Sequence, residues 1–219
     1  MTLLPVLYRL DIQSDSRIFQ GQSVPDIAKV LFAEHGIENV QWELSAEHLM
    51  REYCVAYRET LLAFIERIFA EEGIFYFLRQ DDRGRHTIIV CDRPEILPDC
   101  AGQPSLAYNA LASGAVKGVY CSSLSFREKL TATSFVQRDY TFHAPAAHME
   151  HRYKPPMLNG AKGDYPLYDY PGRFKEEATG DAFTRHKLEA ARVDASIAHG
   201  VANAPHLIAG HGVTLSDHP

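Results

Sequence analysis

The sequence of 219 residues lacks the long apolar runs of membrane proteins and the basic runs of nucleic-acid-binding proteins. No apolar stretch approaches the ~20 residues that a helix needs to span a bilayer, and Pro5 and Arg9 lie where a signal peptide has its apolar core. There is no run of basic residues, and 22 Lys and Arg against 28 Asp and Glu give a formal net charge of −6. We therefore expect a chain made as a soluble cytosolic protein, with no nucleic-acid partner and no stable membrane insertion.

Cysteine is scarce, with four residues and no Cys-x-x-Cys pair. A chain of this length can bury a core without disulfide staples, so no disulfide framework is indicated. We expect reduced, mostly buried thiols at Cys54, Cys91, Cys100 and Cys121. A disulfide between Cys91 and Cys100, across a Pro-containing loop, stays the alternative that a cytosolic origin disfavours.

The motifs of nucleotide and serine chemistry are also missing. Neither G-x-x-x-x-G-K-[ST] nor G-x-G-x-x-G occurs, and Ser122, Ser123 and Ser125 lie in a strand-like run without a G-x-S-x-G elbow. Glu71 and Glu72 resemble a pair of acids, but neighbours on a helix point about 100° apart, so we expect them on a solvated face. The sequence therefore predicts no catalytic residue and no enzyme.

Eleven histidines raise the question of a metal site. His143, His148 and His151 form the tightest group, but their spacing is irregular and they lie in a loop, whereas zinc enzymes hold three ligands on rigid elements. A second group shares no helical or strand register: His199, His206, His211 and His218. We expect no metal ligand, no catalytic metal and no cofactor-binding residue.

A first amphipathic helix is predicted over 24–35. Ser23 can cap it with Asp26 in a capping box, Pro25 fits its first turn, and Gly36 fits a left-handed C-terminal cap. Its apolar residues recur at helical spacing: Val24, Ile27, Val30 and Leu31.

A second helix has a complete apolar stripe and ends at Gly73. The stripe comprises Leu61, Phe64, Ile65, Ile68 and Phe69. An aromatic run over 74–78, turn residues over 81–84 and a strand over 86–90 predict a β-hairpin packed on this helix. We expect the stripe to lie in the core beneath the strand over 74–78.

The segment 93–105 contains three prolines and is the expected boundary between a helix and hairpin subdomain, 1–99, and a β-rich subdomain, 100–219. Beyond it, composition predicts further elements. They are strands over 118–126 and 133–142, an irregular excursion over 144–171, a helix over 176–190, a strand with alternating Val193, Ala195 and Ile197, and a strand over 207–215 broken at Gly210. Together these elements predict an α+β fold.

A sharp turn is predicted over 169–174. Pro171 fixes its own φ, and Gly172 can adopt the positive φ that closes a type II turn, so that Arg173 and Phe174 are presented to the next helix. Two interpretations stay open. The turn is plain architecture sealing a small satellite core, or it also fixes a surface used between subunits.

Four segments of the sequence resemble the hub module of the VgrG spike proteins of type VI secretion systems. They read DSRIFQ at 15–20 with SVPDI at 23–27, REYCV and YRE within 51–59 followed by EEGIFYF at 71–77, DYPGRF at 169–174, and the last segment at 210–219. The resemblance implies a mixed, largely antiparallel hub fold of the phage tail type. It also implies a structural subunit of a homotrimeric hub stacked under the Hcp tube, with a needle-tip protein and effectors or adaptors in the full-length protein, assembled in the cytoplasm and injected with the spike.

The resemblance also shows departures. In the family a β-barrel precedes the matching region, and an oligonucleotide-binding-type barrel and needle follow it. We therefore expect this chain to be either a shortened piece or the product of a disrupted gene. A tail hub of a phage or tailocin is the alternative function, and an effector enzyme is the remote one, since catalytic extensions in the family lie beyond the needle.

Overall fold

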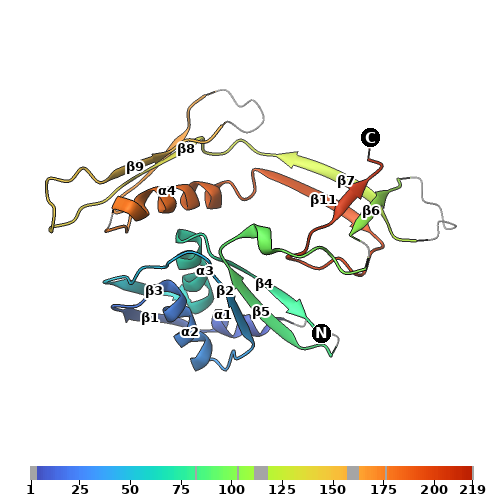
Figure 1. Ribbon diagram of the computed structural model, residues 1–219, viewed down its shortest axis with the longest axis horizontal. Helices are drawn as coiled ribbons and strands as arrows, with labels where there is room; N and C mark the ends of the chain where they lie inside the picture. The colour runs from blue at the N-terminus through green and yellow to red at the C-terminus, as the bar shows by residue number, and fades with distance from the viewer. Residues whose placement is uncertain are drawn as a thin grey trace. The chain divides into compact units, whose positions relative to one another are not determined.

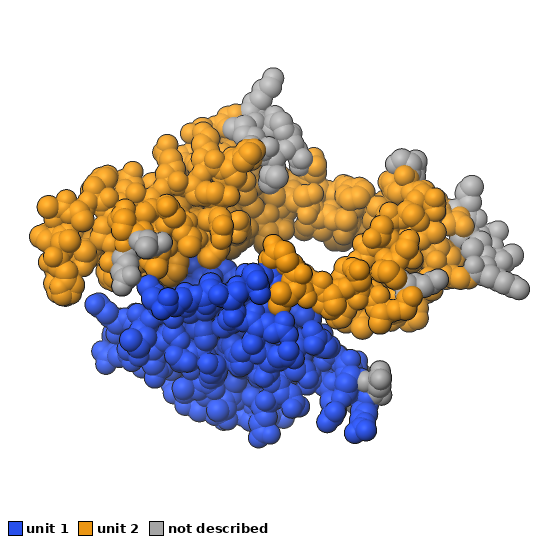
Figure 2. All heavy atoms as spheres, viewed as in Figure 1, with its two compact units in different colours: residues 1–93 blue, residues 94–219 orange. Residues whose placement is uncertain are grey.

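The computed structural model describes residues 4–81, 83–102, 104–110, 118–156, 163–175 and 177–218. The chain divides into two compact units, 1–93 and 94–219, and the division falls at the start of the Pro-containing segment (Figure 2). Some residues of the predicted segments lie outside the described residues. They are Asp82, Gln103, residues 157–162, Glu176 and Pro219. None of the helices described has the length and apolar character needed to cross a membrane.

The first unit combines helices with two small sheets (Figure 1). Its elements are η1 (Val6–Tyr8), α1 (Arg9–Ile12), β1 (Ser14–Phe19), α2 (Val24–Glu34), β2 (Val40–Glu43), β3 (Cys54–Thr60), α3 (Leu61–Glu71), β4 (Phe75–Gln80) and β5 (His86–Cys91). β1 and β3 form an antiparallel pair, while β5 lies between parallel β2 and antiparallel β4.

Helix α2 forms where its capping residues predict it. The Ser23 hydroxyl accepts a hydrogen bond from the Asp26 N–H at 3.4 Å. At the other end Gly36 has φ +64°, and the N–H of Ile37 donates to the Phe32 carbonyl at 2.9 Å, which completes a Schellman motif. The prediction for this helix is confirmed, although Val30 of the expected stripe is exposed.

Helix α3 carries the core of the first unit. The Thr60 side chain caps its start, and Gly73 with φ +71° ends it. All five residues of the predicted stripe are buried, and the Phe64 ring stacks on Phe19 with 5.6 Å between centroids. The predicted hairpin of β4 and β5 packs on the same core, with partly buried Tyr76 and Leu78 against it, which confirms the expected arrangement.

In its described residues the second unit contains one long helix and two sheets. Its elements are η2 (Pro94–Ile96), β6 (Ser105–Tyr108), β7 (Tyr120–Glu128), β8 (Ser134–Arg138), β9 (Glu150–Tyr153), β10 (Pro166–Asp169), α4 (Glu177–Ala191), β11 (Ser196–Ala202) and β12 (Thr214–Ser216). The strand orders are β10-β8-β9, with α4 packed on β8 and β9, and β11-β7-β6-β12. Parallel and antiparallel pairs occur in both sheets, and the predicted α+β class is confirmed.

Three expectations for this unit are wrong in part. The excursion expected over 144–171 contains strands β9 and β10, because both pair with the central strand β8. Val193 lies in the turn that follows α4 and is 81% exposed, so the strand begins only at Ser196. The last strand is limited to β12, since Gly210 and its neighbours form a turn.

The buried stripe of α3 yields a stability prediction. Ile68→Ala removes a fully buried side chain and leaves a cavity, so it should lower the free energy of unfolding by about 2–5 kcal/mol. Urea denaturation followed by far-UV circular dichroism measures the change, with Val193→Ala as the exposed control. A loss below ~0.5 kcal/mol for Ile68→Ala would contradict the core assignment.

Candidate functional site

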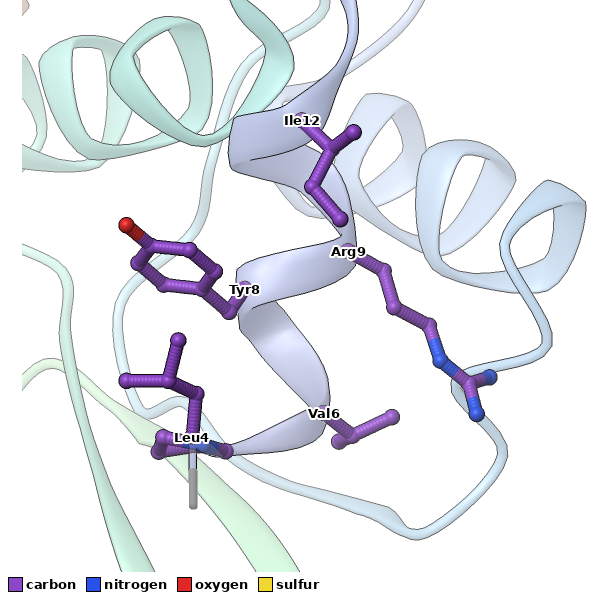
Figure 3. Close-up of a pocket in the computed structure, with 6 residues that line it drawn as sticks. Leu4, Val6, Tyr8, Arg9 and Ile12 are labelled. Atoms are coloured by element: carbon purple, nitrogen blue, oxygen red, sulfur yellow. The ribbon is translucent and has the colours of Figure 1, made fainter. Parts of the chain in front are cut away.

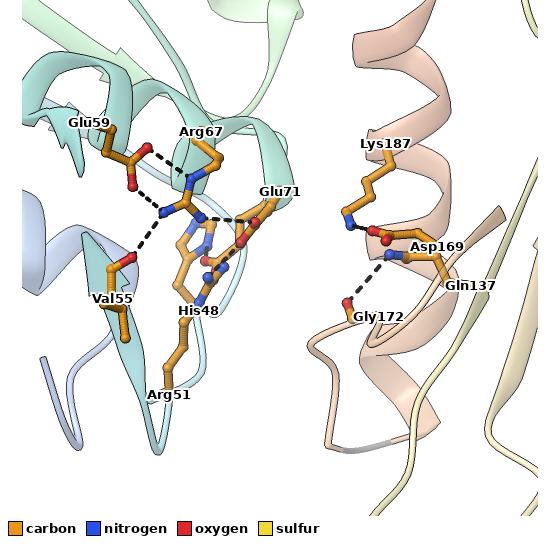
Figure 4. Close-up of polar contacts among 11 residues, drawn as sticks. His48, Arg51, Val55, Glu59, Arg67, Glu71, Gln137, Asp169, Gly172 and Lys187 are labelled. Atoms are coloured by element: carbon orange, nitrogen blue, oxygen red, sulfur yellow. Dashed lines mark hydrogen bonds and ion pairs between the residues drawn. The ribbon is translucent and has the colours of Figure 1, made fainter. Parts of the chain in front are cut away.

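Polar side chains come together in a cluster in each unit; Figure 4 shows most of the first, and of the second unit it shows Gln137, Asp169, Gly172 and Lys187. The first, named here the arginine cluster, joins the segment between β2 and β3 to helix α3. It comprises His48, Arg51, Glu59, Arg67, Glu71 and Glu72. The second, named here the His151 cluster, joins the sheet β10-β8-β9 to helix α4 and to the turn at 169–174. It comprises Gln137, His151, Phe174, Gly180, Asp181 and Thr184.

Arg51 is the centre of the arginine cluster. Its guanidinium donates to Glu71 at 2.6 Å and to Glu72 at 2.7 Å, and the three side chains are only 12%, 7% and 4% exposed. Burial alone would lower the pKa of Arg51, but the two carboxylates outweigh it and the pKa is raised. The buried guanidinium therefore stays charged and paired.

His48 extends the cluster toward the end of β5. Its Nδ1 lies 2.7 Å from Glu72, and its Nε2 lies 3.8 Å from Asp92. Burial would raise the pKa of Asp92, but the N–H groups of Ala46 and Ser45 donate to its carboxylate and the pKa is lowered. The segment that contains His48 and Arg51 is therefore bonded to Glu72 at the end of α3 and to Asp92 after β5.

Arg67 connects the cluster to strand β3. It donates to both oxygens of Glu59, at 2.6 and 3.2 Å, and to the Val55 carbonyl at 3.0 Å. It also lies 3.5 Å from Glu71 (Figure 4). The Cys54 thiol lies in this environment, and its pKa is raised because burial outweighs the neighbouring guanidinium groups.

The cluster corrects our expectation for Glu71 and Glu72. Both residues are buried, at 6% and 7% exposure, and neither forms a solvated face. Their partner Arg51 comes from a segment that helical periodicity does not reach. The one sequence signal was indirect: Arg51 and the two glutamates stand in two of the segments that resemble the spike family, REYCV and EEGIFYF, and the fold brings these segments together.

The chemistry of the arginine cluster is structural. Every carboxylate is engaged by a guanidinium, an imidazole or backbone N–H groups, and no nucleophile is aligned with a base. An apolar hollow lies elsewhere in the first unit, and residues of one short segment line it: Leu4, Pro5, Val6, Tyr8, Arg9 and Ile12 (Figure 3). Arg9 donates to the His35 carbonyl at 3.2 Å, so the hollow lacks the converging polar groups of a catalytic pocket.

His151 is the buried member of the second cluster. Its Nδ1 lies 2.7 Å from Asp181, and its ring and that of Phe174 are nearly perpendicular, with 5.1 Å between centroids. Helix α4 can pack closely on His151 of β9 because Gly180 has no side chain. A Cβ there would lie 2.2 Å from the imidazole. Thr184 of the same helix donates to Gln137 of β8, so α4 is fixed on the sheet.

The turn at 169–174 differs from the prediction. The Tyr170–Pro171 peptide bond is cis, and Arg173, not Gly172, has the positive φ, at 64°. Gly172 instead donates its N–H to the Arg138 carbonyl at 2.9 Å and packs against the Phe174 ring. Phe174 is 1% exposed, and Asp169 forms an ion pair with Lys187 of α4. Phe174 is buried beside His151, whereas Tyr170 is 57% exposed, so the expectation that both rings seal a small core is wrong for Tyr170.

The histidines and serines that the sequence raised as candidates, and for which we expected no site, have separate surroundings. His143 lies beside Phe142, His148 beside Glu150, and His151 within its own cluster. Ser122 donates to the Val201 carbonyl, while Ser123 and Ser125 are exposed. Among the described residues no group of three or more His, Cys, Asp or Glu side chains is arranged to hold a metal ion.

The C-terminal histidines are dispersed. His199 lies on strand β11, His206 in a turn, His211 near the Ala209 carbonyl, and His218 beside the ring of Tyr108. The absence of a catalytic metal stays a prediction.

The four cysteines are free and buried, as predicted. Burial, together with Glu43 and Asp92, raises the pKa of Cys91 to about 11. Neither Cys91 nor Cys100 forms the alternative disulfide.

Comparison with protein families shows one match that spans the chain. The model described as phage tail baseplate hub (GPD) matches residues 1–219. The spike protein VgrG3 of Vibrio cholerae is 38% identical over 218 residues, and VgrG2b of Pseudomonas aeruginosa is 35% identical over 219 residues. In both comparisons the whole of this chain is covered, and it spans about one fifth of the length of these relatives, 21% in each case.

Solved structures share the fold. A component of the Escherichia coli type VI secretion system, c3393, described as similar to the T4 tail proteins gp27 and gp5, matches with a TM-score of 0.59 and 18% identity over 98% of this chain and 44% of its own. A prophage tail protein of Shewanella oneidensis matches with a TM-score of 0.60 and 12% identity over 96% of this chain and 62% of its own.

The arginine cluster yields a mutational prediction. Arg51→Met keeps an apolar stem but leaves Glu71 and Glu72 buried without their guanidinium, so we expect a loss of about 3–5 kcal/mol in the free energy of unfolding. Urea denaturation of this variant and of the control Arg85→Ala measures the loss. The Arg85–Asp81 pair is exposed, so its removal should change the free energy of unfolding little. Equal effects of the two variants would refute the role assigned to burial.

The turn yields a second prediction. A Cβ at Gly172 would lie 2.4 Å from the Phe174 ring, so Gly172→Ala should lower the free energy of unfolding by about 1–3 kcal/mol through overpacking. Gly200→Ala is the matched control in the same unit, because its Cβ would meet no atom closer than 3.4 Å. Thermal denaturation compares the two variants. An unchanged midpoint for Gly172→Ala would mean that the Phe174 ring shifts freely.

Proposed function

The chain belongs to the phage tail baseplate hub (GPD) family, and from this premise we propose that it is a structural part of the spike of a type VI secretion system. The observation that carries the proposal is the match over the whole chain to the hub family, combined with 38% identity to a spike protein. In this role the chain is a subunit of a homotrimeric hub under the Hcp tube, assembled in the cytoplasm and expelled with the spike. Effectors, adaptors and a needle-tip protein bind the full-length protein.

A phage or tailocin tail hub is the second candidate, because the fold is shared with a prophage tail protein. That likeness rests on 12% identity, whereas spike proteins of type VI secretion systems are 33% to 38% identical over the whole chain. The type VI assignment is therefore the one we propose.

We assign the chain an assembly role and no enzymatic one. One relative is named as an actin cross-linking toxin, and this chain spans 20% of it. The same residues also match relatives named only as spike proteins. In the described part of the chain, the charges of the arginine cluster form structural ion pairs and not an acid–base or nucleophilic arrangement.

A chimeric spike tests the proposal. Residues 1–219 replace the matching segment of a full-length Pseudomonas aeruginosa spike relative, and secretion of the Hcp tube protein is measured by immunoblot of the culture medium. We expect secretion to continue. The same chimera with Arg51→Met, which disrupts the arginine cluster, should lose it. A chimera that is expressed and folded but secretes no tube protein would contradict the proposal.

A further inference from the structure

The sheet of β1 and β3 in the first unit has an exposed aromatic face. The two strands pair side by side (Figure 1), and residues of the inner face, such as Phe19 and Ala56, belong to the buried core. Side chains alternate along a strand, so Ile18 and Tyr57 point away from this core, and they are 59% and 61% exposed. Tyr53, just before β3, is 58% exposed. We name the following residues the Tyr57 patch: Ile18, Tyr53, Tyr57 and Arg58.

The backbone of Arg58 is unusual for its residue type. Asp15 pairs with Glu59 and Ser16 pairs with Tyr57, so Arg58 is the extra residue of a β-bulge in β3. Its φ is 53°, in the left-handed region. A bulge of this geometry favours glycine, because a Cβ destabilises the left-handed backbone. Strain of this kind is typical of positions with a function, and a bulge can re-aim a side chain.

The side chain of Arg58 is stacked and has no carboxylate of its own. Its guanidinium carbon lies 5.1 Å from the centroid of the exposed Tyr57 ring. The carboxylates that flank the bulge are engaged by other arginines, at 3.9 Å for Asp15 and 2.6 Å for Glu59. Arg58 forms no ion pair with any residue in the described part of the chain. Its planar fork of N–H groups is therefore open to a carboxylate from another molecule.

We infer that the Tyr57 patch binds a partner protein that presents a carboxylate beside apolar side chains. The carboxylate accepts hydrogen bonds from Arg58, and the apolar side chains cover Ile18 and the Tyr57 ring. Tyr and Arg are enriched among the residues that dominate the binding energy of interfaces. Stacking on Tyr57 also orders the guanidinium before binding, which lowers the entropic cost of the contact.

The charges of the patch determine which partner fits. A second copy docked through the same face would bring two Arg58 guanidinium groups together, and like charges at an interface are unfavourable. The exposed Glu52 precedes Tyr53 at the other end of the patch, so the acidic contact belongs at the Arg58 end. An acidic partner of different sequence is therefore the occupant we assign. The inference concerns the first unit alone and goes beyond the proposed function.

Peptide binding to the full chain tests the inference. The probe is a fluorescently labelled peptide of alternating Val and Asp, and the same peptide with Lys in place of Asp is its control. We expect fluorescence anisotropy to show binding of the Asp peptide alone. Arg58→Gly removes the guanidinium and suits the left-handed φ, so it should weaken binding at least about tenfold and raise the melting temperature. Arg83→Ala removes an exposed arginine elsewhere in the unit and should change neither value.

Four outcomes would overturn the inference. They are equal affinity for the Asp and Lys peptides, an affinity that Arg58→Gly leaves unchanged, an equal loss with Arg83→Ala, and self-association of the chain that Arg58→Gly abolishes in sedimentation. Because Arg58→Gly is expected to be the more stable protein, its loss of binding cannot be assigned to unfolding. The chimeric spike tests the assembly role separately, since secretion and peptide binding can fail independently.

Discussion

A buried guanidinium must have carboxylates around it, and in the first unit this requirement determines how several segments are joined. Arg51 satisfies it with Glu71 and Glu72 at the end of α3. Its backbone is also fixed, because its N–H donates to the Gln22 carbonyl and its own carbonyl accepts from Gly21, just before α2. A replacement by apolar residues can be as stable as a buried ion pair, but it lacks the directional bonds that specify one arrangement. Here the arrangement joins α2 and α3 to the segment before β3.

Local rules were sufficient for α2 and α3, whereas the short helices η1 and α1 were not predicted. Ser23, Pro25 and Gly36 act within a few residues of themselves, and the apolar spacing of α3 reports directly which side is buried. The arginine cluster was beyond such rules. Spacing on a helix assigns a residue outside the stripe to solvent, and it contains no information about a guanidinium that arrives from twenty residues away.

The second unit shows the same limit in its strands and its turn. β9 and β10 have only 4 residues each, and they exist because β8 provides hydrogen bonds on both sides. At Gly172 the residue types favoured a positive φ, but the bond to the Arg138 carbonyl and the Phe174 ring decide the conformation instead. Sequence predicted that no catalytic group would be found, yet it did not reveal how His151 and Gly180 fix α4.

The raised pKa values of the buried thiols have a chemical consequence. Only the thiolate attacks a disulfide or an oxidant, and a thiol with a pKa of about 11, as at Cys91, is ionised in roughly one molecule in ten thousand at pH 7. Cys54 is shifted in the same direction. In the folded first unit, burial therefore disfavours thiol exchange at these two positions, because it both suppresses the thiolate and covers the sulfur atoms.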